Sequence, residues 1–358
     1  MCRSGAQQCG VAFMGANLQA SLAAVEAFVA GSDLGSLPGW DRSRPWALEP
    51  LAQGEYNMNY VLRQDDRRYV VRVNVGTQIE RDDQILYEYR ALELLRASGV
   101  TPLPYWVDDR RDRLPFGVLI MEYLPGVALD YGRDLERAAR LFARIHSLPV
   151  DPAQNHLIRE TRPLSMTYDE CRRLLSVYFQ SDLGTPEIKG YMREVLSWAQ
   201  EARHRERFFV SDPWPCVINT EVNSGNFIWN AERETLHLVD WEKPLWGDPS
   251  QDLSHFCVPT TTLWKTDVRL GGEQRRRFLD AYRDALSDAH LRDTIVERVR
   301  LRDPFNCLRG ISWSAMAWVS YQQDAHALKN QDTFDKMSSY LDMRFLRGLF
   351  DPHMNAGG

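Results

Sequence analysis

The chain changes character near Pro125-Gly126, and this change limits the folds open to it more than any other feature. Before that point, short apolar stretches alternate with polar and turn-forming residues, a pattern typical of a strand meander. We expect strands from residue 46 into Gly54, and then over 59–63, 69–75, 104–109 and 116–124. The first part of the chain therefore predicts a small antiparallel sheet.

Helical patterns interrupt these strands once and then dominate the rest of the chain. Ile85, Tyr89 and Leu92 recur at helical spacing within the segment 82–99. Later helices are predicted over 134–148, 166–180 and 187–202, with several more from 272 to 350, and two short strands over 226–230 and 236–240. The sequence thus predicts an α+β, two-lobed fold, with a small antiparallel sheet lobe plus a larger, mainly helical lobe.

The length of 358 residues, 44% of them apolar, allows two substantial units. We expect residues 1–36 to hold a leader to about residue 16 and then an amphipathic helix over 17–30, with Met14 as an alternative start to Met1. The sheet lobe would occupy residues 37–125, and the helical lobe residues 126–358.

Charge and composition limit the classes of partner that we expect this protein to bind. Lys and Arg number 43 against 49 Asp and Glu, for a formal net charge of -6. Such a balance lacks the basic footprint of a nucleic-acid binder, so we expect no nucleic acid. No uncharged apolar run approaches the roughly 18 residues of a membrane span, so we expect a soluble protein and no membrane. Six cysteines without C-x-x-C pairs indicate neither a zinc site nor a disulfide framework and favour a cytoplasmic location.

Four polar features follow one another in the middle of the helical part. Asn226 comes five residues after Glu221, and Asp240 fourteen residues later at the end of the apolar segment LHLVD. The segment GDPSQD, ending in Asp252, completes the order. Phosphoryl transfer from a nucleotide needs oxygen ligands for metal ions and a carboxylate that orients the acceptor hydroxyl. Taken singly, Asn226 and Asp240 would be ordinary turn and strand-end residues, but the full order favours that chemistry.

This order resembles the aminoglycoside phosphotransferase and choline kinase family, relatives of the protein kinases, over about residues 46–325. The family pattern reads H-x-D-x-x-x-x-N, then an apolar strand ending in D-W/F-E, then G-D-P-x-x-D. The chain has Asn219 in place of the histidine and Glu221 in place of the catalytic aspartate. It matches the pattern at Asn226, Asp240-Trp241-Glu242, Gly247-Asp248-Pro249 and Asp252. The resemblance implies a protein-kinase-like fold that uses ATP and Mg²⁺ to phosphorylate a hydroxyl of a small molecule.

The resemblance also implies roles in the helical lobe. Glu221 would orient the acceptor hydroxyl and accept its proton, while Asn226 and Asp240 would hold magnesium. Asp252 would brace the catalytic loop. The resemblance gives no role to Glu242.

Further roles fall on the sheet lobe. Arg72 stands where protein kinases have a lysine, and it would engage the nucleotide phosphates with Glu88 behind it. Gly54 and Asn57 would form a turn that presents backbone N–H groups to the phosphates. Backbone groups from Glu122 to Leu124 would bind adenine.

Glu221 leaves two interpretations open. Its extra methylene group moves the carboxylate more than about 1 Å from where aspartate would place it, and such a displacement can cost about a hundredfold in rate. We favour a working enzyme, because positioning and metal ions carry most of the catalysis of phosphoryl transfer. The alternative is a catalytically impaired pseudokinase that binds nucleotide as a regulatory or scaffold module.

Aromatic residues in the last third bear on the acceptor. Trp313, Trp318 and Tyr321 follow one helical stretch, and with Trp264 and Asp324 they would suit a cationic acceptor such as an amino sugar or amino alcohol. Packing in the helical core is the commoner explanation for such a stripe. Two histidines, His146 and His255, are expected to be structural. The sequence leaves the acceptor, ATP against GTP, and the oligomeric state undecided.

Overall fold

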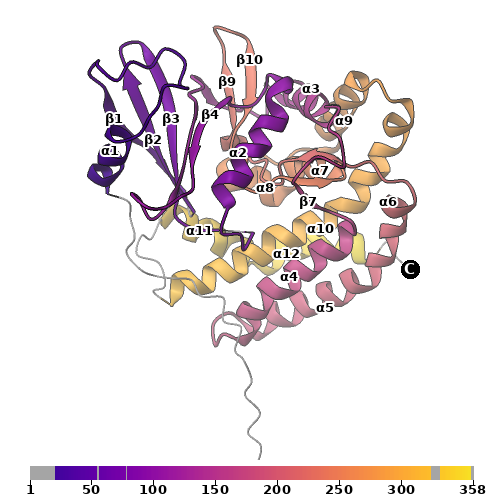
Figure 1. Ribbon diagram of the computed structural model, residues 1–358. Helices are drawn as coiled ribbons and strands as arrows, with labels where there is room; N and C mark the ends of the chain where they lie inside the picture. Colours follow the sequence, from indigo (N-terminus) through magenta and orange to yellow (C-terminus); the bar gives the residue numbers. More distant parts are fainter. Residues whose placement is uncertain (1–20, 55, 78, 324–330, 356–358) are drawn as a thin grey trace, which may run out of the picture.

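The structure is a computed structural model, and it describes residues 21–54, 56–77, 79–323 and 331–355 (Figure 1). The predicted leader, Met14, Cys2, Cys9 and Asp324 lie outside these residues. Helix α1, Leu22–Ala30, confirms the described part of the expected N-terminal helix. Ser21 caps it by accepting a hydrogen bond from the amide of Ala24.

The first part of the chain forms the predicted antiparallel sheet of five strands, in the order β1-β2-β3-β5-β4. The strands are β1 Ala47–Gln53, β2 Asn57–Gln64, β3 Arg67–Asn74, β4 Pro104–Asp108 and β5 Gly117–Glu122. All five predicted strands are confirmed. Strand β2 begins at Asn57, two residues earlier than expected, because Asn57 pairs with Asn74 of β3.

The two faces of this sheet are covered by different helices. Val70 of β3 belongs to the core that also contains Ile85 and Leu92 of α2, Gln84–Leu95. Val71, the next residue, belongs to a second core together with Phe28 of α1. This alternation is the period-two pattern of a strand that is buried on both faces. Helix α2 continues into a 3₁₀ turn, and Gly99 ends it in the left-handed conformation, as the sequence predicted.

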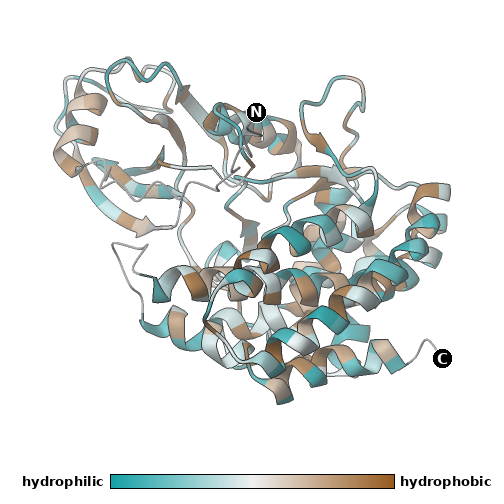
Figure 2. Ribbon diagram, turned by 90° about the horizontal axis from the view of Figure 1, so that it is seen from below, coloured by the Kyte–Doolittle hydropathy of each residue, from teal (hydrophilic) through white to brown (hydrophobic). Residues whose placement is uncertain are grey.

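The helical lobe contains the predicted helices and additional short ones. They are α3 Leu135–His146, α4 Pro163–Gln180, α5 Pro186–Ala202, α6 Arg207–Ser211, α7 Ser250–Cys257, α8 Pro259–Lys265, α9 Gly272–Ala285, α10 Ala289–Gln322, α11 Gln331–Tyr340 and α12 Met343–Met354. Hydrophobic and hydrophilic residues alternate along these helices (Figure 2). Their apolar residues form a shared core, in which Leu175 of α4 and Leu308 of α10 are fully buried. None of the described helices combines the length and apolar character needed to cross a membrane.

Short strands within the helical lobe are connected by two loops that contain the motif residues. They form two three-stranded sheets, β10-β9-β6 and β7-β11-β8. Their bounds are β6 Val127–Ala128, β7 Ile158–Arg159, β8 Cys216–Ile218, β9 Phe227–Asn230, β10 Thr235–Leu238 and β11 Leu245–Gly247. Residues 219–226 connect β8 to β9, and residues 239–244 connect β10 to β11. We call them the first and second loops.

One boundary prediction is wrong. The strand expected over 236–240 ends at Leu238, so Asp240 lies in the second loop and not in a strand. The amide of Val239 donates to the carbonyl oxygen of Asn226, and Asp240 has a φ of +63°. This left-handed conformation interrupts the regular extended backbone of a strand. The bounds proposed for the two lobes stay predictions.

Candidate active site

The first loop is fixed to α7 through Asp252. The amides of Asn219 and Thr220 donate to the two oxygens of the Asp252 carboxylate, each at 2.8 Å. Nε2 of His146 lies 3.4 Å from the same carboxylate, and its Nδ1 lies 3.0 Å from the hydroxyl of Tyr282. These contacts confirm the bracing position predicted for Asp252 and the structural one predicted for His146.

Hydrogen bonds join the two loops and also close the first loop on itself. The side-chain amide of Asn219 donates to the carbonyl oxygen of Asp240 at 2.9 Å. The Asn226 side chain donates to the carbonyl oxygen of Glu221 at 2.7 Å, which leaves its own amide oxygen as the atom available to a metal ion. The hairpin of β9 and β10 therefore brings together Glu221, Asn226 and Asp240, which the motif had singled out.

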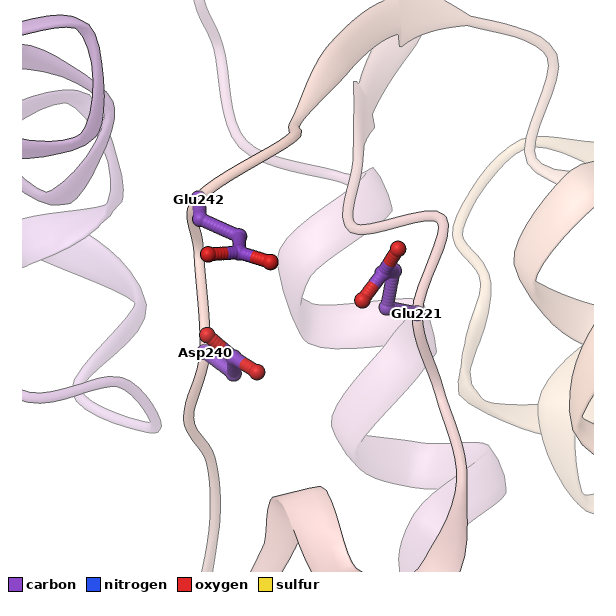
Figure 3. A group of neighbouring side chains, drawn as sticks. All are labelled: Glu221, Asp240 and Glu242. Atoms are coloured by element: carbon purple, nitrogen blue, oxygen red, sulfur yellow. The ribbon is translucent and has the colours of Figure 1, made fainter. Parts of the chain in front are cut away.

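Three carboxylates converge where the loops meet (Figure 3). Glu221 faces Asp240 and Glu242 across the gap between the loops, and one oxygen of each lies within 4.8 Å of the other two. Glu242 had been given no role. The signal that could have found it is the Asp240-Trp241-Glu242 sequence itself, which places a second acid two residues after a proposed metal ligand.

Burial and mutual repulsion raise the pKa of two of these acids. Burial raises the pKa of Glu242 well above its ordinary value, and the charges of Asp240 and Glu221 raise it further. Burial also raises the pKa of Glu221, while Lys243 opposes this effect and Asp240 adds to it. A divalent cation would relieve such repulsion, and carboxylate oxygens are the ligands that Mg²⁺ prefers. The donor set therefore fits a hard divalent ion.

Arg72 connects the sheet lobe to this site. Its guanidinium lies 2.6 Å from the Glu88 carboxylate and 2.9 Å from that of Asp240, and both Arg72 and Glu88 are buried. Burial alone would lower the pKa of Arg72, but Glu88 and Asp240 outweigh this effect and raise it. The predicted contact of Arg72 with Glu88 is confirmed, and the arginine stays cationic beside the carboxylates.

The residues predicted for the phosphate turn occupy two different environments. Gly54 is exposed, and its amide donates to the carbonyl oxygen of Asn57 at 2.9 Å. Asn57 is the first residue of β2 and is buried. Its side chain donates to the Glu242 carboxylate and accepts a hydrogen bond from Asn74 at 3.0 Å. Asn57 thus closes the predicted turn with its backbone and contacts a carboxylate with its side chain, and the part of Gly54 and Asn57 in phosphate binding stays a prediction.

The segment predicted to bind adenine begins at the end of β5. The amide of Glu122 donates to the carbonyl oxygen of Leu103 at 2.8 Å, and its carboxylate accepts from the amide of Leu103 at 3.2 Å. Leu124, two residues further, is half-buried in the link between the lobes. These contacts position the segment, and its part in adenine binding stays a prediction.

The aromatic stripe packs into the helical lobe. The rings of Trp264 and Trp313 meet edge to face at 5.4 Å between centroids. Trp318 stacks on Phe334, and its indole nitrogen donates to the hydroxyl of Ser338. Trp264 and Trp318 both pack against the core that α4 and α10 share. These contacts are what the core explanation predicts.

A model described as the phosphotransferase enzyme family matches residues 47–292 of the chain. The chain belongs to this family. The matched region runs from β1 into α10, so it includes the sheet lobe, both loops and Asp252.

Two named proteins resemble part of the chain. Acyl-CoA dehydrogenase family member 10 of Mus musculus and the thiamine kinase of Shigella boydii serotype 4 are each 25% identical to it over 63% of its length. The match spans 21% of the mouse protein and 66% of the thiamine kinase.

Solved phosphotransferase structures share the protein-kinase-like fold. The microcompartment-associated aminopropanol kinase matches 92% of the chain and 98% of its own, with a TM-score of 0.63 and 17% identity. The choline kinase of Cryptosporidium parvum Iowa II matches 92% and 97%, with a TM-score of 0.62 and 13% identity. A spectinomycin phosphotransferase in complex with ADP and spectinomycin matches 87% and 93%, with a TM-score of 0.55 and 12% identity.

Proposed function

We propose that this member of the phosphotransferase enzyme family transfers the γ-phosphate of ATP, bound with Mg²⁺, to a hydroxyl group of a small molecule. The observation that carries this proposal is the convergence of Glu221, Asp240 and Glu242 beside the cationic Arg72, where the two lobes meet. Metal-assisted phosphoryl transfer uses this combination of carboxylates and a fixed cation.

Asp240 and the amide oxygen of Asn226 would hold the metal ion, with Glu242 as a further ligand. When bound, Mg²⁺ neutralises charge on the phosphate oxygens and holds them in place. The carboxylates are already gathered within 4.8 Å of one another, so little rearrangement is required of the chain. Their mutual repulsion without a cation supports this assignment.

The nucleotide would lie along the sheet lobe. Arg72, held by Glu88, would contact the phosphates with its remaining N–H groups, and the exposed turn at Gly54 would lie above them. Backbone groups between Glu122 and Leu124 would bind the adenine. The spectinomycin phosphotransferase structure, whose fold this chain shares, contains ADP, which supports a nucleotide as donor.

Glu221 would orient the acceptor hydroxyl and take its proton. A general base works best when its pKa lies near the working pH, and burial moves the pKa of Glu221 in that direction. The chain resembles proteins named as kinases of thiamine, aminopropanol and choline, so a cationic amino alcohol is the acceptor class we propose to test first.

The test is ADP release from MgATP in the presence of a panel of small alcohols that includes these three compounds. We expect acceptor-dependent release by the natural protein and none by Asp240→Asn, which keeps the shape of the side chain but removes its charge. Repeating the assay with GTP in place of ATP shows which nucleotide the protein uses as phosphate donor. Binding of MgATP without transfer to any acceptor would contradict the proposal and favour the pseudokinase alternative.

A further inference from the structure

Thr220, the residue before Glu221, has an unusual backbone conformation. Its φ is +72°, in the left-handed region that β-branched residues rarely adopt. Such a conformation costs on the order of 1–3 kcal/mol and persists only where the surroundings fix it. The contacts that hold Thr220 in this conformation therefore also fix the position of the Glu221 backbone.

Three different elements hold Thr220. Its amide donates to Asp252 of α7 at 2.8 Å, and its hydroxyl donates to the carbonyl oxygen of Lys243 in the second loop at 2.9 Å. Its carbonyl oxygen accepts a hydrogen bond from the Arg309 guanidinium of α10 at 3.0 Å. The amide, hydroxyl and carbonyl of Thr220 are thus fixed from three directions.

Glu170 of α4 contacts two of the residues that hold Thr220, Lys243 and Arg309. Its carboxylate lies 3.2 Å from the Lys243 ammonium and 3.2 Å from the Arg309 guanidinium. Burial tends to raise the pKa of Glu170, but Arg309 and Lys243 outweigh it and lower the pKa to about 2. The carboxylate therefore stays ionised at neutral pH and keeps both contacts.

The same two cations act on Glu221 itself. Lys243 and Arg309 are the positive groups that attract its carboxylate, while Asp240 and, more weakly, Glu170 repel it. The three side chains of Lys243, Glu170 and Arg309 are exposed by 15%, 28% and 14%, so solvent screens these interactions only partly. The hydrogen bonds of Thr220 thus fix the Glu221 backbone, and the charges of Lys243 and Arg309 attract the Glu221 carboxylate.

We propose that Lys243, Glu170 and Arg309 form a positioning bracket that sets how far the Glu221 carboxylate reaches toward the acceptor hydroxyl. This inference rests on the proposed function, because it takes Glu221 as the group that orients the hydroxyl. The bracket accounts for a glutamate at the position where the family has aspartate: the backbone is held where the longer side chain fits. All three are positioning residues that act through Glu221.

The test compares Glu170→Gln, Arg309→Gln and Arg309→Lys with the natural protein. ADP release from MgATP is measured with water as the acceptor, so no other substrate is needed. We expect kcat to fall about 10- to 100-fold in the two Gln variants, as a misplacement near 1 Å would cause, with KM for MgATP changed less than about twofold. Arg309→Lys keeps the charge but cannot make both contacts, so it should recover part of kcat.

Arg275→Gln is the matched control. Arg275 pairs with Asp303 in a contact of similar exposure between α9 and α10, outside the first loop. It should lower stability without lowering kcat. The bracket is overturned if both Gln variants keep kcat within about twofold, or if their KM for MgATP rises in step with the loss of kcat.

Hydrogen exchange in the peptide 219–226 supplies a readout that needs no activity. Glu170→Gln and Arg309→Gln should speed exchange in this peptide, whereas Arg275→Gln should not. Unchanged exchange in both variants overturns the bracket. A natural protein that binds MgATP but releases no ADP with water or with any alcohol of the panel would count against the proposed function, and the exchange result would still decide the bracket.

Discussion

Glu221 stands where the motif that the chain resembles has an aspartate. The structure places its carboxylate within reach of Asp240 and Glu242 and under the influence of Lys243 and Arg309. The surroundings are therefore arranged around glutamate, and restoring the family's aspartate should misplace the carboxylate.

The corresponding prediction is that Glu221→Asp lowers kcat for ADP release about 10- to 100-fold, because the carboxylate retreats by about 1 Å. Glu221→Gln, which keeps the length but removes the base, should lose about 10²- to 10⁴-fold. Steady-state kinetics at saturating MgATP check both values. A Glu221→Asp variant as fast as the natural protein, or faster, would show that the site is not adapted to glutamate.

Glu242 offers a second prediction at the scale of one residue. An acid whose pKa is raised by folding loses stabilising effect as the pH rises through that pKa, because the unfolded chain ionises first. At pH 8.5 without metal, Glu242→Gln should therefore raise the melting temperature by about 1–2 °C, as roughly 1 kcal/mol would in a protein of 358 residues. Thermal melts in EDTA measure this change.

Added Mg²⁺ supplies the control for Glu242→Gln. The ion should stabilise the natural protein more than the variant, because the variant has one carboxylate fewer to offer. A variant that melts below the natural protein in EDTA would contradict the assigned repulsion.

At the scale of elements, Glu170 links α4 to α10 and to the second loop. Its folded pKa of about 2 lies below the ordinary value of 4.5, so its ion pairs stabilise the fold above about pH 4.5. This stabilisation is lost as the pH falls toward 2. Glu170→Gln should therefore destabilise the protein most at neutral pH, and the difference from the natural protein should shrink progressively below about pH 4.5.

Urea unfolding at several pH values between 3 and 7 measures this difference. Glu136→Gln serves as the comparison variant. Glu136 of α3 also pairs with an arginine on another helix, Arg277 of α9. A destabilisation by Glu170→Gln that grows as the pH falls would contradict the account.

Elements with strong periodicity were predictable from the sequence, and short ones were not. The strands β1 to β5 and helices α2 to α5 follow apolar spacing that depends only on local residues. Strands β6, β7, β8 and β11 have two or three residues and exist through pairing with distant segments, so no local pattern reveals them. The strand predicted over 236–240 is too long because the left-handed conformation of Asp240 has no local sequence signal.

The residues of the candidate site likewise fall into two groups, those that the sequence predicted and those that only the structure revealed. The motif order identified Glu221, Asn226, Asp240 and Asp252, because the two loops lie close in sequence. Glu170 and Arg309 stand 51 and 88 residues from Glu221 in the numbering, and only the packing of α4 and α10 brings them to the loops. No motif that we recognised contains them.

At the scale of the whole molecule, the sheet lobe is attached to the second loop. Arg72 contacts Asp240, and Asn57 contacts Glu242. The hydroxyl of Tyr87 in α2 donates to the carbonyl oxygen of Pro244 at 2.5 Å and accepts from the amide of Ile158 at 3.1 Å. The carboxylates proposed to hold metal therefore lie in a segment of the helical lobe that residues of the sheet lobe also contact.

Tyr87→Phe tests this attachment away from the carboxylates. Removing the buried hydroxyl leaves two backbone groups without their partner, which should cost about 1–3 kcal/mol of unfolding free energy. Urea unfolding measures the change. Tyr69→Phe, which removes a hydroxyl bonded to Pro38 within the sheet lobe, is the control and should cost less, because that group is closer to solvent. Equal costs would argue against a special role for Tyr87.

The account as a whole depends on Asp240 binding a divalent cation that carries the nucleotide. Isothermal titration calorimetry with a non-hydrolysable ATP analogue, in Mg²⁺ and in EDTA, measures this directly for the natural protein, Asp240→Asn and the remote Asp303→Asn. We predict that Mg²⁺ tightens binding at least tenfold in the natural protein and in Asp303→Asn, and that Asp240→Asn loses this gain. An equal gain from Mg²⁺ in all three proteins would contradict the account.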